Sequence, residues 1–127
     1  MMDTEVRAMN GAELKATMGA LGVPPSWLAQ HLHVTMRTVV RWFDTDVLSP
    51  QVVSAVDKLR TVTDAEMDRM RKGVDKRRNV VELKTYRTDE DVPGSVADLP
   101  ATWHRQMVYR LMEELRAEGK TVTVRYA

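Results

Sequence analysis

The chain has 127 residues, a hydrophobic share of 43% and a formal net charge of +1 at pH 7. This length suits one domain, or one small domain with an appended module, and the absence of cysteine excludes disulfides and thiolate metal sites. No apolar run is long enough to span a bilayer, and the acidic first residues do not resemble a signal peptide, so we expect a cytoplasmic protein.

The first part of the chain predicts short helices. Apolar residues at helical spacing predict a first helix over 9–21, which Gly22 ends. Pro25 suits the first turn of a second helix, and Thr35 is a good N-cap for a third helix over 36–44. The sequence therefore predicts two short helices joined by a tight turn, as in a helix-turn-helix.

Two further helical stretches follow. Ser49 and Pro50 open a fourth helix, and the strongly charged stretch over 63–78 is also helical. Thr63 and Glu66 have the spacing of a capping box, which would start a fresh helix. Alternatively, the two stretches run on as one helix, and the sequence leaves both interpretations open.

In the last part of the chain the spacing of apolar residues changes from the helical pattern to one that includes strands. The stretches "VVELKTYR" at 80–87 and "TVTVRY" at 121–126 predict strands, separated by an acidic loop over 88–100 and an amphipathic helix over 101–118. Two strands that pair only with each other are marginal and leave open edges. We therefore expect a homodimer in which the strands pair with those of a second subunit. The predicted dimerisation residues are Trp103, Met107, Leu111, Val122, Val124 and Tyr126.

The predicted fold is mainly α with a small C-terminal β element. It comprises an N-terminal helix-turn-helix bundle of four to five helices followed by a strand-helix-strand dimerisation unit. The domain boundaries that follow are 9–62 for the helix-turn-helix domain, 63–78 for a charged helical connector and 79–127 for the dimerisation domain.

The stretch "LAQHLHVTMRTVVRWF" resembles the helix-turn-helix of the lambda-repressor and Cro superfamily, also called Xre-type regulators. The matching residues are Leu28, Ala29, Val34, Thr35, Val39 and Trp42. The chain departs from the usual pattern at His33, where the family often has glycine, and at Phe43, where it often has glutamate. The whole layout, with "TWHRQMVYRLMEEL" as its last helix, is also similar to the regulators encoded beside phage anti-CRISPR genes. A phage or mobile-element origin is implied by this resemblance.

The resemblance implies that the third helix enters the major groove of double-stranded DNA. Arginine donates two hydrogen bonds to guanine, and apolar side chains meet the thymine methyl group. The residues expected to contact bases are Met36, Arg37, Val40 and Arg41. Those expected to contact phosphates are Ser26, Gln30, Thr35 and Thr38, of which Thr38 also offers a methyl group to thymine. Asp44 and Asp46 are expected to face away from DNA or to pair with Arg41.

Other kinds of site fit the sequence less well. His31 and His33 are two residues apart, which on a helix places them on different faces, so they do not chelate a metal together. No nucleophile or glycine-rich phosphate loop lies near a histidine, so we expect no enzyme activity, metal or cofactor. The basic run over 69–78 is typical of a solvated helix face and also suits a DNA backbone.

The sequence thus predicts a sequence-specific DNA-binding transcriptional regulator, a dimeric repressor that binds an inverted repeat and regulates its own operon. Two alternatives stay open. One is an antitoxin, which uses the same kind of domain while a partner protein binds elsewhere. The other is a protein-interaction module on a helix-turn-helix scaffold.

Overall fold

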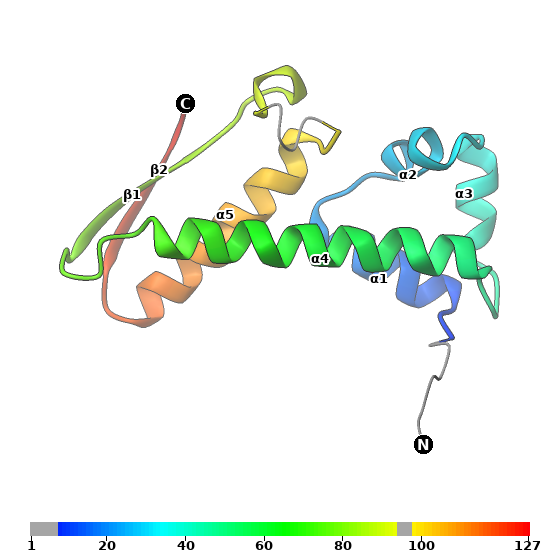
Figure 1. Cartoon of the computed structure of the whole chain (residues 1–127), viewed down its shortest axis with the longest axis horizontal. Helices are drawn as coiled ribbons and strands as arrows, with labels where there is room; N and C mark the ends of the chain where they lie inside the picture. The colour runs from blue at the N-terminus through cyan, green and yellow to red at the C-terminus, as the bar shows by residue number, and fades with distance from the viewer. Residues whose placement is uncertain (1–7, 94–97) are drawn as a thin grey trace.

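The structure, a computed structural model, describes residues 8–93 and 98–127. Helices α1 to α3 surround one end of the long helix α4, and α5 and the two strands lie at its other end (Figure 1). The prediction of a mainly helical chain with a small C-terminal β element is confirmed. In chain order the elements are α1 (Gly11–Leu21), α2 (Pro25–Leu32), α3 (Met36–Trp42), α4 (Pro50–Lys72), β1 (Val80–Thr85), the short 3-10 helix η1 (Asp89–Asp91), α5 (Ala101–Ala117) and β2 (Thr121–Tyr126).

Local capping explains where the first helices begin and end. Asn10 and Glu13 form a capping box, in which each side chain accepts a hydrogen bond from the other residue's backbone N–H (2.9 and 3.0 Å), so α1 begins at Gly11. Gly22 ends α1 in the left-handed conformation, with φ of 71°. A Cβ at Gly22 would lie 2.5 Å from the carbonyl oxygen of Thr102, so this glycine also lets α1 approach the start of α5.

Helix α4 is one continuous helix of 23 residues. Of the two interpretations, the single helix is therefore confirmed, and a new helix that begins at Thr63 is excluded. The Thr63 hydroxyl donates to the Leu59 carbonyl (2.7 Å) and accepts a hydrogen bond from Trp103 Nε1 (2.9 Å). Thr63 is therefore a buried contact to α5 rather than an N-cap. The predicted boundary between 62 and 63 falls inside this helix, and a single apolar core extends along both of its halves.

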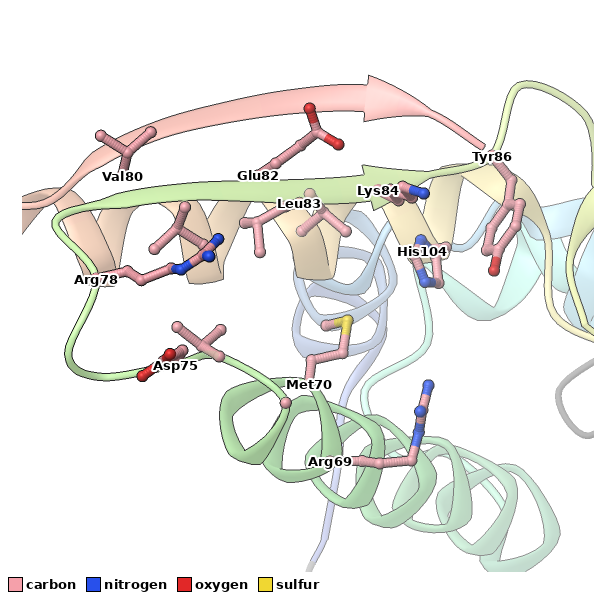
Figure 2. Close-up of a pocket in the computed structure, with 14 residues that line it drawn as sticks. Arg69, Met70, Asp75, Arg78, Val80, Glu82, Leu83, Lys84, Tyr86 and His104 are labelled. Carbon is pink, nitrogen blue, oxygen red and sulfur yellow. The ribbon is translucent and has the colours of Figure 1, made fainter.

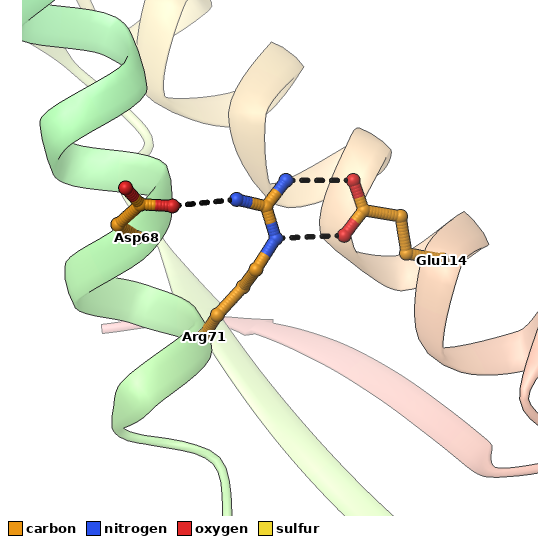
Figure 3. A network of polar contacts seen from close by, with 3 residues as sticks. All are labelled: Asp68, Arg71 and Glu114. Carbon is orange, nitrogen blue, oxygen red and sulfur yellow. Dashed lines mark hydrogen bonds and ion pairs between the residues drawn. The ribbon is translucent and has the colours of Figure 1, made fainter.

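An ion-pair network fastens the C-terminal part of α4 to α5 (Figure 3). The Arg71 guanidinium donates to both carboxylate oxygens of Glu114 (2.9 and 2.8 Å) and to Asp68 (2.9 Å). The hydrogen bonds from Arg71 hold the pKa of the Glu114 carboxyl below its usual range. The bidentate geometry adds direction to the attraction between the two helices.

Removing the Glu114 charge should lower the stability of the fold only at pH values at which this carboxyl is ionised. Because the folded-state pKa is lowered, the contribution is present above the ordinary glutamate pKa and is lost as the pH falls through the folded-state value. We expect Glu114→Gln to lower the free energy of unfolding by about 0.5–1 kcal/mol at pH 7, since solvent screens this half-exposed pair. Urea unfolding from pH 7 to pH 3 should show the wild-type and variant curves converging. A constant difference across this range would contradict the assignment.

Strands β1 and β2 pair with each other in parallel, with Val81 opposite Val122 and Leu83 opposite Val124. Parallel neighbours need a crossover, which α5 provides. Any pairing with a second subunit is therefore left to the outer edges of this two-stranded sheet.

Helix α5 buries its apolar face against α1, α4 and the sheet. Three of the predicted dimerisation residues, Trp103, Met107 and Leu111, are at most 1% exposed, and Val122 is also buried. These side chains belong to the chain's own core and are not available to a second subunit. Val124 and Tyr126 remain at the surface, 39% and 49% exposed.

Candidate nucleic-acid interface

A tight turn joins α2 to α3, as predicted. The backbone N–H of Val34 donates to the Ala29 carbonyl (2.9 Å), which closes α2, and His33 adopts the left-handed conformation with φ of 57°. The Thr35 side chain then accepts a hydrogen bond from the backbone N–H of Thr38 (3.2 Å) and caps α3. The turn therefore changes the direction of the chain between two short helices within three residues (Figure 1).

His33 is the one non-glycine residue with positive φ among residues 8–93 and 98–127. The left-handed conformation costs a residue with a side chain roughly 1–2 kcal/mol relative to glycine. Glycine in turn loses more backbone freedom on folding, which offsets part of that gain. We expect His33→Gly to raise the free energy of unfolding by about 0.5–1 kcal/mol in urea titrations. A loss of stability would mean that the imidazole ring makes a stabilising contact of its own.

Small and apolar side chains hold α2 against α3. Leu28, Ala29 and Val39 are 1%, 4% and 0% exposed, so both helices contribute side chains to the buried core. Trp42 is partly buried against the same core, as are Leu32, Val34 and Phe43. The inner face of α3 is thus fixed by packing, which leaves its other face at a defined position.

Gly11 also supports α3, and sequence reasoning missed it. A Cβ at Gly11 would lie 2.2 Å from the Trp42 carbonyl oxygen, and the Gly11 N–H donates to the Thr45 carbonyl (2.8 Å). The first turn of α1 therefore touches the backbone at the end of α3. The sequence does contain a hint of this contact, because Gly11 stands at a helix start where no positive φ requires glycine. A glycine in such a position often marks a close approach of another backbone segment.

The outer face of α3 carries all four residues predicted to contact bases. Met36 and Val40 are 47% and 49% exposed, and Arg37 and Arg41 are exposed beside them. Within residues 8–93 and 98–127 neither arginine forms an ion pair. The structure therefore presents two free guanidinium groups and two apolar side chains on one helix face.

The residues predicted to contact phosphates lie at the start of α3 and along α2. Ser26, Gln30 and Thr35 are exposed, whereas Thr38 is half-buried. The hydroxyls of Thr35 and Thr38 are 3.0 Å apart and share a hydrogen bond. Thr35 and Thr38 thus stabilise the start of α3 in addition to any contact that they make with a ligand.

The two acidic residues after α3 do not pair with Arg41. Asp44 and Asp46 are exposed, and among the described residues no ion pair links either of them to that arginine. Instead, the Arg41 carbonyl accepts the backbone N–H of Asp44 (3.1 Å). The Arg41 guanidinium is therefore not neutralised by its nearest carboxylates in sequence.

His31 and His104 pack against neighbouring side chains of the fold. His31 stacks on the Trp27 ring, with centroids 4.8 Å apart and an interplanar angle of 11°. His104 is buried, its Nδ1 lies 2.9 Å from the Thr85 hydroxyl, and burial lowers its pKa. In the part of the chain that the structure describes, no three histidine, aspartate or glutamate residues are grouped to hold a metal ion.

The basic run over 69–78 is not brought to the α3 face. It lies at the other end of α4, beside the strands (Figure 1). Two of its arginines are already paired, Arg69 with Glu66 and Arg71 with Glu114. The guanidinium groups of Arg37 and Arg41 therefore form a separate basic surface.

No protein-family model matches the chain, and none of the curated proteins is similar to it in sequence. The resemblance to the lambda-repressor and Cro superfamily thus rests on the residues around the turn between α2 and α3. Among the helices of residues 8–93 and 98–127, none has the length and apolar character needed to cross a membrane.

Proposed function

We propose that the chain is a sequence-specific transcriptional regulator that places α3 in the major groove of double-stranded DNA. The observation that carries this proposal is the outer face of α3, where Arg37 and Arg41 have no ion-pair partner in the described part of the chain and flank the exposed Met36 and Val40. The edges of bases offer the matching groups, since guanine presents two acceptors and thymine presents a methyl group.

The spacing of the two arginines suits separate base pairs. Arg37 and Arg41 are four residues apart on α3 and so lie about 6 Å apart along its axis. Successive base pairs are about 3.4 Å apart, so the two side chains address different steps of the duplex. Because α3 is fixed by Val39 and by the close contact at Gly11, these side chains project from a rigid support.

A binding titration tests this proposal. A labelled duplex from the region upstream of the chain's own gene is compared with a scrambled duplex of the same composition by fluorescence anisotropy. We expect tighter binding to the upstream duplex, and an affinity that falls steeply between about 50 and 200 mM salt because phosphate contacts release counterions. Equal and weak binding to both duplexes at low salt would favour the protein-interaction alternative.

We also propose that the regulator is a homodimer joined through the outer edge of β2. Hydrogen bonds from the Thr121 and Ala127 N–H groups to β1 place the backbone of Val122, Val124 and Tyr126 on the outer edge. The Arg116 guanidinium donates a hydrogen bond to the Val122 carbonyl (3.1 Å). The backbone groups of Val124 and Tyr126 therefore form the open part of this edge. An open strand edge readily pairs with the same edge of a second copy about a two-fold axis.

The side chains beside this edge suit a second copy. Val124, Tyr126 and Tyr109 are 39%, 49% and 51% exposed and line an apolar hollow of about 370 Å³. A two-fold dimer would present two copies of α3 to an inverted repeat with half-sites about one helical turn apart. Such a dimer on its own promoter would act as a repressor, with the phage or mobile-element origin still resting on the resemblance.

A charge on this surface should prevent dimerisation. We expect Val124→Lys to be monomeric in sedimentation velocity at concentrations where the wild-type chain is dimeric, because two lysines would meet across the apolar contact. Thr123→Lys places the same charge on the opposite face of β2 and should remain dimeric. A wild-type chain that is monomeric at micromolar concentration, or a dimer that survives Val124→Lys, would exclude this interface.

A further inference from the structure

A groove runs beside β1 (Figure 2), and β1 lies at the end of the molecule remote from α3 (Figure 1). One wall is the end of α4, with Arg69, Met70 and the C-cap residue Gly73, and the other is β1 itself. His104 and Val108 of α5 form its floor. The volume of about 490 Å³ lies within the range of about 300–1,000 Å³ that is typical of binding sites.

The outer edge of β1 faces this groove with free backbone groups. The carbonyls of Asn79 and Thr85 accept hydrogen bonds from the N–H groups of Thr121 and Ala127 (2.8 and 2.9 Å), so they point toward β2. Backbone groups alternate in direction along a strand, and those at positions 80, 82 and 84 therefore point away from β2. Among the described residues, none of these three groups has a backbone partner in another element.

The groove has an apolar interior and a basic rim. Leu83, Val108 and the partly buried Met70 line its interior. Arg78 and Lys84 are exposed and lie along its rim (Figure 2). Two acidic side chains also line the groove, and one of them is neutralised by an ion pair. The Glu82 carboxylate pairs with Arg125 of β2 (3.3 Å), and the Asp75 carboxylate accepts the Arg77 backbone N–H (3.0 Å). Arg78 and Lys84 thus outnumber the remaining negative charge of Asp75, so the net charge of the rim is positive.

We propose that this groove binds an extended segment of a partner protein, in which apolar residues alternate with acidic residues, as an added strand on the outer edge of β1. The free backbone groups at 80, 82 and 84 would supply the ladder of hydrogen bonds that this mode of recognition requires. Side chains of a strand alternate between its faces, so the apolar residues would face Val108 and the acidic residues would lie beside Lys84.

The position of the groove separates this partner from DNA. It lies at the opposite end of α4 from α3, so the segment and the duplex would bind at the same time (Figure 1). Helix α4 borders the groove opposite β1 (Figure 2), and a volume of about 490 Å³ suits one extended chain rather than a second folded unit. The outer edge of β2 instead borders the apolar hollow lined by Tyr109 and Tyr126, so the two strand edges serve different partners.

The test uses the full chain and a labelled hexapeptide of alternating valine and glutamate. Fluorescence anisotropy should show this peptide binding at least tenfold more tightly than a valine–lysine peptide of the same length. Methylation of alternate backbone nitrogens in the valine–glutamate peptide should abolish binding, because the strand would lose its donors. Amide shifts in NMR spectra should be confined to β1, the end of α4 and the part of α5 around His104 and Val108.

A charge-reversal variant provides the second arm. We expect Arg78→Glu combined with Lys84→Glu to bind the valine–lysine peptide more tightly than the valine–glutamate peptide, whereas Lys58→Glu, elsewhere on α4, keeps the wild-type preference. Circular dichroism and DNA titration of each variant verify folding independently of the peptide. Absent binding at millimolar peptide, unchanged binding after N-methylation, or shifts centred on β2 would each overturn the proposal, whatever the outcome with DNA.

Discussion

Arg41→Ala is expected to weaken binding to the specific DNA site by about 1–3 kcal/mol, or roughly 5- to 150-fold, without changing the stability of the fold. The side chain is exposed, and in the described residues it has no ion-pair partner that its removal would leave unsatisfied. Arg37→Ala should have an effect of the same size, since the two residues share the outer face of α3. Anisotropy titrations on specific and scrambled duplexes would measure both losses.

Two control variants separate base recognition from charge. Arg41→Lys retains the positive charge and loses the bidentate geometry, so we expect a loss of specific affinity with little change in the salt dependence. Arg110→Ala removes one charge from the exposed surface of α5 and should change specific affinity only slightly. If Arg41→Ala and Arg110→Ala weakened binding equally, the contribution of Arg41 would be general electrostatics rather than base recognition.

Trp103→Ala is expected to lower the free energy of unfolding by about 3–5 kcal/mol. The side chain is 0% exposed at the contact between α4 and α5, and its ring nitrogen donates to the Thr63 hydroxyl (2.9 Å). The change would leave a cavity as well as remove that hydrogen bond. A loss of this size is a large part of the stability of a small domain, so urea titrations need a stabilising buffer for the variant.

The manner of unfolding is as informative as the loss. Trp103 and Thr63 join the end of the chain to the middle of α4, so we expect one cooperative transition rather than two. Trp103→Phe combined with Thr63→Val should show coupling in a double-mutant cycle, because each single change breaks the same hydrogen bond. Separate transitions for the two halves would instead support an independent N-terminal domain.

Features with local causes were predictable from the sequence. The capping box at Asn10 was not predicted, but Gly22, Pro25 and Thr35 fixed the ends of the first three helices to within about two residues. Arg37 and Arg41 each lie two positions from the buried Val39, so helical spacing alone places them on the opposite face of α3. These features depend on neighbours within one helical turn.

Features with distant causes were not predictable in the same way. Thr63 has the local pattern of a cap, yet its hydroxyl contacts Trp103 of α5 across 40 positions of the chain. The apolar stripe of α5 was predicted to be an interface between subunits. The sequence does not show that α4 is long enough to cover this stripe within the same chain. The contact between Gly11 and the backbone of Trp42 likewise exists only once α1 and α3 have packed.

Selection from a pool of random duplexes tests the central claim most directly, because the selected sequences themselves define the operator. The wild-type chain is expected to enrich an inverted repeat that contains guanines and has half-sites about one helical turn apart. The same selection with the Arg37→Ala and Arg41→Ala double variant should enrich no such sequence. A wild-type selection that yields no sequence preference would contradict the assignment of α3 as a DNA-reading helix.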